Sequence, residues 1–312
     1  MKEIGGFFGI EVYNNNNKYY KNGYDFNYAR NCLDFIIKER KIDEIYLPVY
    51  LCNSVKEKCI KAGCKINYYH IKRDFTPDLE KINKNSYIYI VNYYGWLDTN
   101  KIKELKEKFR RIIVDNAQAF FNDYVDNIDT IYSYRKFFGV PDGACLITDL
   151  KTKENFDRES VSDIVYFLVG RNEKNANKYY DDFRKSEVDI KEKKIKKISL
   201  FSENILNAID YEQIKKIRES NFNFLHNKLK EINKLNIKNV IYYMYPLLLE
   251  EKQDEIRKKL IDNKIYIPKL WPNITGESVI EKEYINNILP IPIDQRYSIN
   301  DMEYILNIIL NW

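Results

Sequence analysis

Segments with the periodicity of helices and of strands follow one another from residue 29 onward. In the first helical segment, residues 29–41, the spacing typical of an amphipathic helix is set by Cys32, Leu33, Ile36 and Ile37. Further helices are predicted over residues 53–62, ended by Gly63, and over 99–110. Short apolar runs predict strands at residues 43–49, 65–70, 87–92, 111–114 and 130–133. Strands and helices that alternate in this way form a mostly parallel sheet covered on both faces, which is an α/β fold.

The second half of the chain has a different pattern. Residues 151–197 are polar and poorly periodic, so no element is predicted there. Residues 199–235 predict one long helix or two joined helices. The last third alternates again, with a strand at 239–248, a helix at 253–262, a strand at 288–291 and a helix from residue 300. We therefore predict a large α/β domain over residues 1–200 and a small C-terminal α+β domain over residues 201–312.

Composition narrows the class of protein. Hydrophobic residues make up 45% of the 312 positions, enough to bury a sizeable core. The 51 basic and 46 acidic residues are well mixed, so no nucleic-acid partner is expected. No apolar run has the length of a signal peptide or a membrane helix, and the five cysteines lack CxxC spacing, so we expect reduced thiols, a cytoplasmic protein and no membrane association. Two histidines make a metal site improbable.

Two segments carry candidate chemistry at the ends of predicted strands, where parallel sheets bind ligands. The apolar run 112–114 leads directly into Asp115, although an aspartate in this place can also simply cap a turn. Lys136 follows 21 residues later, among aromatic residues and before a Pro-Asp-Gly turn at 141–143. A lysine that forms a Schiff base and a carboxylate that keeps a pyridine nitrogen protonated are what pyridoxal phosphate requires. Together the two segments favour a pyridoxal-phosphate pocket.

The sequence of these segments resembles the DegT/DnrJ/EryC1/StrS family of pyridoxal-phosphate sugar aminotransferases, and in particular a short, poorly characterised bacterial branch. Residues 115–119, Asp-Asn-Ala-Gln-Ala, are similar to the family's Asp-x-Ala-Gln-Ala motif. Lys136, with Asp142 and Gly143 six and seven positions later, is similar to its lysine followed by a glycine-rich turn. The resemblance implies an aspartate-aminotransferase-like fold (fold type I), a homodimer, and transfer of an amino group from glutamate to a keto-sugar or nucleotide-linked keto-sugar in surface polysaccharide or related biosynthesis.

The resemblance also assigns residues to the cofactor. Lys136 is the expected catalytic residue and cofactor attachment point. Asp115 is expected to meet the pyridine nitrogen, and Gln118 the ring oxygen. Ser133, three positions before Lys136, is expected at the phosphate, although the family's serine lies five positions before its lysine.

Three further positions of the expected cofactor site depart from the family. Ala29 and Arg30 stand where the family has the Gly-Thr of its phosphate loop, and an arginine side chain can bind phosphate there. Cys52 stands where the family has the aromatic that stacks on the ring, and Tyr50 is the candidate substitute. These departures leave two alternatives open: an inactive member with a binding or regulatory role, and a member that catalyses another pyridoxal-phosphate reaction.

Overall fold

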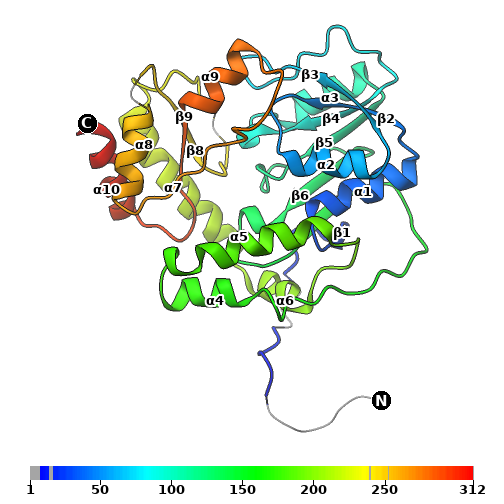
Figure 1. Ribbon diagram of the computed structural model, residues 1–312, viewed down its shortest axis with the longest axis horizontal. Coiled ribbons are helices and arrows are strands. Elements are labelled where there is room, and N and C mark those ends of the chain that lie inside the picture. Colours follow the sequence, from blue (N-terminus) through cyan, green and yellow to red (C-terminus); the bar gives the residue numbers. More distant parts are fainter. Residues whose placement is uncertain (1–7, 14–16, 239, 252, 312) are drawn as a thin grey trace.

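A seven-stranded sheet forms the centre of the larger part of the molecule in the computed structural model, which describes residues 8–13, 17–238, 240–251 and 253–311 (Figure 1). Its strand order is β1-β7-β6-β5-β4-β2-β3. The strands are β1 (Tyr24–Phe26), β2 (Glu44–Pro48), β3 (Lys65–Tyr69), β4 (Tyr87–Val91), β5 (Arg111–Asp115), β6 (Asp129–Ser133) and β7 (Ala144–Ile147). All neighbouring pairs from β6 to β3 are parallel, and only β7 runs antiparallel to its neighbours β6 and β1. The predicted mostly parallel sheet is confirmed.

Helices cover both faces of this sheet, as the alternating pattern predicts. Helices α1 (Ala29–Arg40) and α2 (Asn53–Lys61) pack on one face, against alternate strand residues such as Tyr89 and Ile113. Helix α3 (Thr99–Lys108) packs on the other face, against Ile88 and Ile112. The predicted helix bounds are confirmed to within two residues. Neighbouring residues of β4 and β5 therefore face opposite layers, and only the strand ends are open to ligands.

The C-terminal part contains a two-stranded antiparallel sheet and its own helices. The elements are α6 (Leu200–Ala208), α7 (Tyr211–Leu229), β8 (Tyr245–Leu248), α8 (Gln253–Asp262), α9 (Val279–Asn287), β9 (Ile288–Ile291) and α10 (Ile299–Leu310). The prediction of two joined helices is confirmed, because Asp210 caps the start of α7 with a hydrogen bond to the Gln213 amide. The core of this part is continuous with that under α1 and α2. The division at residue 200 stays a prediction.

The strand predicted over 239–248 is shorter than expected. Only residues 245–248 pair with β9; residue 239 lies outside the described residues. In the segment before β8, the Tyr242 ring stacks on Phe222 of α7 at 4.5 Å, and Arg218 of α7 binds the Tyr242 and Tyr243 carbonyls. These contacts with a helix replace strand pairing before residue 245, so the strand begins later than predicted.

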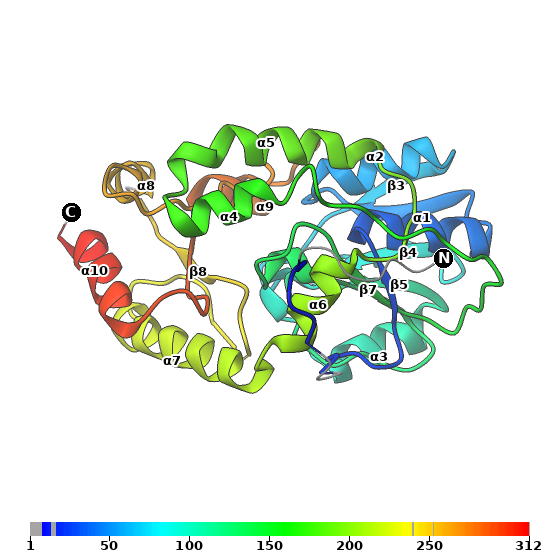
Figure 2. The same ribbon diagram turned by 90° about the horizontal axis from the view of Figure 1, so that it is seen from below.

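The polar segment 151–197, for which no element was predicted, contains two helices. Helices α4 (Tyr166–Glu173) and α5 (Tyr180–Asp189) form a hairpin, joined by the short helix η3 (Asn177–Tyr179) and followed by η4 (Ile190–Glu192). The hairpin lies to one side of the sheet and extends toward α8 (Figure 2). Within α4 and α5 only Phe167, Gly170 and Ser186 are buried, so the sequence contains little apolar periodicity to reveal them.

Candidate active site

Asp115 and Lys136 come together at the carboxyl ends of the neighbouring parallel strands β5 and β6. Asp115 is the last residue of β5 and is buried; its carboxylate accepts hydrogen bonds from the Ala117 amide and the Tyr89 hydroxyl, both at 2.8 Å. Lys136 ends the helical turn η2 (Tyr134–Lys136) that follows β6. Burial raises the pKa of Asp115, whereas these two hydrogen bonds and the charge of Lys136 lower it. The charge of Lys136 therefore acts on the buried Asp115 carboxyl from the end of the neighbouring strand.

Lys136 reaches into a cavity of about 730 Å³ between the sheet, the hairpin and the C-terminal part. Its ammonium lies 5.9 Å from the centre of the Tyr243 ring. The pKa of Lys136 is raised, chiefly through its interaction with Tyr243, although desolvation in the cavity lowers it. The side chain is therefore a cation at neutral pH and must lose a proton before it can act as a nucleophile.

The cavity is strongly cationic and aromatic. Only one acidic side chain, Asp294, lines it, and Asp294 already pairs with Arg296 at 2.6 Å. The cationic lining residues are Arg135, Lys136, Arg171, Arg218 and Arg296. Aromatic walls come from both sides of the cavity, among them Phe137, Phe167, Phe183 and Tyr243. Such a lining favours an anionic ligand that also has a flat or apolar part.

Gln118 and Ser133 lie near Asp115 and Lys136 in the chain and at the same edge of the sheet. The Gln118 side-chain oxygen accepts a hydrogen bond from the Tyr94 amide at 3.1 Å, which orients its amide. Ser133 is the last residue of β6 and is buried, and its backbone pairs with Ala144. Gln118 is thus held by a neighbouring loop, and Ser133 by the sheet.

The first turn of α1 forms the other end of the site. Tyr28 precedes the helix, so Ala29 and Arg30 are its first residues, and their amides belong to the unpaired N–H groups of a helix N-terminus. Burial lowers the pKa of Arg30, while the carboxylate of Glu187 opposes this effect. Glu187 of α5 also forms an ion pair with Arg135, next to Lys136. A carboxylate therefore lies among Arg30, Arg135 and Lys136.

Tyr50 and Cys52 have different surroundings. Tyr50 is fully buried, and its ring packs against Tyr93 at 5.5 Å and Trp271 at 4.7 Å. No hydrogen bond or ring contact found among the described residues connects Tyr50 to Lys136. Cys52 is half-buried, directly before α2, and its thiol lies 3.1 Å from the Ser54 hydroxyl. The roles of Tyr50 and Cys52 at the cofactor stay predictions.

The segment after Lys136 is held by two residues, Gln295 and Arg218, that were not among the predicted site residues. The Phe137 carbonyl accepts a hydrogen bond from the Gln295 amide at 2.6 Å and a longer one from Arg218. The Arg218 guanidinium also donates to the Gln295 side chain and to the Tyr242 and Tyr243 carbonyls. Burial lowers the pKa of Arg218 to about 10. Because these partners are up to 158 positions apart, no local sequence signal could reveal them.

We expect Arg218→Met to destabilise the protein by roughly 2–4 kcal/mol, because two buried carbonyls and one partly buried carbonyl lose a donor that methionine cannot replace. The free energy of unfolding in urea would measure this. Lys216→Met, on the exposed side of the same helix, is the control and should stay within about 0.5 kcal/mol of the wild type. Equal stability of the two variants would contradict the assigned role of Arg218.

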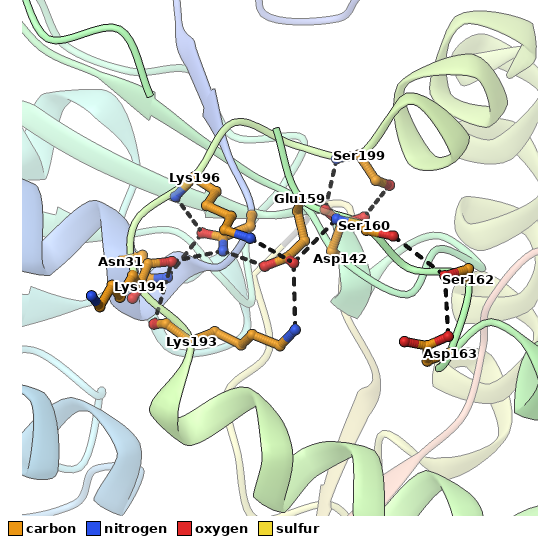
Figure 3. A network of polar contacts seen from close by, with 11 residues as sticks. Asn31, Asp142, Glu159, Ser160, Ser162, Asp163, Lys193, Lys194, Lys196 and Ser199 are labelled. Atoms are coloured by element: carbon orange, nitrogen blue, oxygen red, sulfur yellow. Dashed lines mark hydrogen bonds and ion pairs between the residues drawn. The ribbon is translucent and has the colours of Figure 1, made fainter. Parts of the chain in front are cut away.

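A second buried network ties the turn before α1 to both ends of the segment that carries the hairpin (Figure 3). The Asn27 side chain donates to the Glu159 carboxylate and to the Lys194 carbonyl, both at 2.9 Å. Lys193 and Lys196 pair with the same carboxylate at 3.4 and 3.6 Å. The start of α1 and the base of the hairpin are therefore one connected unit.

Two classes of site find no support in the part of the chain that the structure describes. No group of three or more His, Cys, Asp or Glu side chains there is arranged to hold a metal ion. No described helix is long and apolar enough to cross a membrane.

Comparison with known proteins was made at the level of sequence and of structure. No protein-family model and no curated protein matches the sequence. The fold matches many solved structures. DesV of S. venezuelae, solved with a ketimine intermediate, has a TM-score of 0.69 and 14% identity, over 93% of this chain and 84% of DesV. A DegT DnrJ EryC1 StrS aminotransferase from Brucella abortus has a TM-score of 0.65 and 13% identity, over 93% and 85%.

A third similar structure is Spr1654 from Streptococcus pneumoniae, named as a sugar aminotransferase and solved in a PLP form. Its TM-score is 0.66 and its identity 15%, over 91% of this chain and 85% of that chain. The structural neighbours are thus DegT/DnrJ/EryC1/StrS-type sugar aminotransferases. The expected fold, that of the type I pyridoxal-phosphate enzymes, is confirmed.

Proposed function

We propose that this chain is a pyridoxal-phosphate-dependent aminotransferase of the DegT/DnrJ/EryC1/StrS family, which transfers an amino group from glutamate to a keto-sugar or nucleotide-linked keto-sugar. The observation that carries the proposal is the position of Asp115 and Lys136 at the carboxyl ends of the neighbouring parallel strands β5 and β6. The similarity in fold to Spr1654 in its PLP form supports the choice of cofactor. A role in surface polysaccharide or related biosynthesis and a homodimer belong to the same proposal.

The residues fit such a cofactor at both ends. At the ring end, Asp115 would hold a proton on the pyridine nitrogen, and the amide of Gln118 would donate to the ring oxygen. At the phosphate end, the first amides of α1, the Arg30 side chain and Ser133 would bind the anion. The carboxylate of Glu187, which lies among the cations there, is an intramolecular stand-in for that anion.

Catalysis would depend on the position of Lys136. Pyridoxal phosphate, when bound, supplies an electron sink that stabilises negative charge on the carbon bearing the amino group. The Lys136 amine would move a proton to and from that carbon, within a cavity lined in part by aromatic side chains. Arg218 and Gln295 would position this amine through the Phe137 carbonyl.

The direct test is the half-reaction with L-glutamate. Protein incubated with pyridoxal phosphate and freed of excess should release up to one 2-oxoglutarate per chain, with a change in the visible absorbance, when no acceptor is present. D-glutamate serves as the matched control. A protein that neither gains visible absorbance with pyridoxal phosphate nor forms 2-oxoglutarate would contradict the proposal.

A further inference from the structure

Helix α5 places an acidic side chain in the most basic part of the site. The Glu187 carboxylate accepts a hydrogen bond from the Arg135 guanidinium, and the side chain is 36% exposed. Burial alone would raise the pKa of Glu187, but Arg135, Lys136 and Arg30 outweigh burial and lower it. The Glu187 carboxylate of α5 therefore interacts with three cations from two other segments, the start of α1 and the turn η2.

Two buried donors beside this carboxylate have no partner within the described chain. The Tyr28 hydroxyl makes no hydrogen bond although Tyr28 is only 2% exposed, and the Arg135 Nε is buried and unpaired. The Arg135 guanidinium lies 5.7 Å from the centre of the Tyr28 ring. Unpaired buried donors are costly, so native structures seldom keep them without a reason. Glu187 leaves the Tyr28 hydroxyl and the Arg135 Nε without an acceptor. A ligand with more acceptor oxygens could accept hydrogen bonds from both.

The hairpin that carries Glu187 makes few stabilising contacts with the rest of the protein, except at its base. Helices α4 and α5 pack mainly on one another and on the short helices η3 and η4. Several large apolar side chains are exposed, including Tyr180 at 56% and Val188 at 63%. The ion pairs from η4 to α2, Lys61–Glu192 and Lys191–Glu57, lie on the surface and contribute little. Such a segment opens at low cost in free energy.

Both ends of the hairpin, in contrast, are fixed to the turn before α1. The Lys197 amide donates to the Asp157 carbonyl, and the Asn27 amide donates to the Lys196 carbonyl. Asn27 also binds Glu159 at one end of the segment and Lys194 at the other. Glu159 and Lys194 are labelled in Figure 3. The hairpin can therefore swing on a fixed base. Because Phe167, Arg171 and Phe183 line the cavity of Lys136, this motion would open the cavity.

We propose that α4 and α5 form a lid over an anion-binding site, that Arg135 and Tyr28 belong to this site with Arg30 and the first turn of α1, and that Glu187 competes there with a phosphate group. Entry of a phosphate group displaces Glu187 and leaves the lid free to move. The identity of the phosphate as that of pyridoxal phosphate rests on the proposed function; the site and the competition do not.

Calorimetric titration with inorganic phosphate, pyridoxal phosphate and pyridoxal tests this competition. Glu187→Gln should bind inorganic phosphate and pyridoxal phosphate roughly tenfold more tightly than the wild type, because the competing state is lost. Its affinity for pyridoxal, which has no phosphate, should not change. Glu192→Gln removes the same charge from an exposed position next to the hairpin and should behave as the wild type. Arg135→Gln should weaken binding of both phosphate ligands.

Hydrogen exchange provides a readout independent of affinity. Inorganic phosphate should speed the exchange of amides in residues 180–189 of the wild type and leave those of β5 unchanged. Equal affinities of Glu187→Gln and wild type for phosphate would overturn the proposal, and so would equal tightening in Glu192→Gln. If phosphate binds more tightly to Glu187→Gln but pyridoxal phosphate yields no visible absorbance, only the proposed function fails. If the absorbance forms with equal affinity in both proteins, only the competition fails.

Discussion

Lys136→Ala should abolish both the covalent attachment of pyridoxal phosphate and amino transfer. The wild type should gain a visible absorbance with the cofactor, lose it on borohydride treatment, and retain a pyridoxyl group on the peptide that contains Lys136. The variant should do none of these, because no other lysine lines the cavity within the described residues. Activity should fall to background, since the same amine attaches the cofactor and moves the proton.

The control for this experiment is Lys103→Ala, on an exposed position of α3. It should match the wild type in absorbance, labelling and activity. Folding of Lys136→Ala can be checked by urea unfolding, where we expect a change of no more than about 1 kcal/mol because the side chain points into the cavity. Retention of the borohydride-stable label in Lys136→Ala would show that the attachment point lies elsewhere.

Asp115→Asn should have opposite effects on activity and on stability. Without the carboxylate, the pyridine nitrogen loses its charged partner, and we expect amino transfer to fall by about 10²–10³-fold. Affinity for the cofactor should fall by roughly ten- to a hundredfold, the usual effect of losing a hydrogen bond to a charged group. The protein without cofactor should become more stable at pH 7, because burial raises the pKa of Asp115 and its charge is unfavourable in the folded state.

The sign of the stability effect follows from the direction of the pKa shift. A carboxyl group whose pKa is higher in the folded state contributes stability at low pH and loses it as the pH rises through the folded pKa. Asparagine does not ionise, so the variant does not lose this stability. The difference in free energy of unfolding between Asp115→Asn and wild type should therefore be larger at pH 7 than at pH 4. Tyr89→Phe is a matched control that removes one hydrogen bond from the same carboxylate and keeps its charge. Equal activity of Asp115→Asn and wild type would contradict the proposed role of Asp115 in binding the cofactor.

Much of the sheet and its ligand-binding edge could be predicted from the sequence, because both depend on short-range patterns. The apolar run 112–114 lies in β5, and Asp115 follows it directly. The helix over 29–41 is revealed by the spacing of its apolar residues, which lie within the buried stretch 31–37, and it places Ala29 and Arg30 at an N-terminus. Since parallel strands end at the same edge, Lys136 could be expected near Asp115.

The hairpin could not be predicted, because its helices bury few side chains and so show little apolar periodicity. Glu187 in α5 looks like any surface acid in the sequence; only the fold places it against Arg135, 52 positions earlier. The same is true of Arg218, whose partners lie in three separate segments. The ring contacts of Tyr50 with Tyr93 and Trp271 likewise join residues far apart in the chain.

The sequence by itself therefore determined the α/β class, the strand ends and the pair Asp115 and Lys136, because hydrophobic periodicity and residue order along a strand are local properties. Only the tertiary structure decided what surrounds this pair: the cationic cavity, the hydrogen bonds to the Phe137 carbonyl, and the carboxylate of Glu187 at the phosphate end. These features arise from contacts between residues far apart in the chain, and chain folding alone brings their charges close enough to interact.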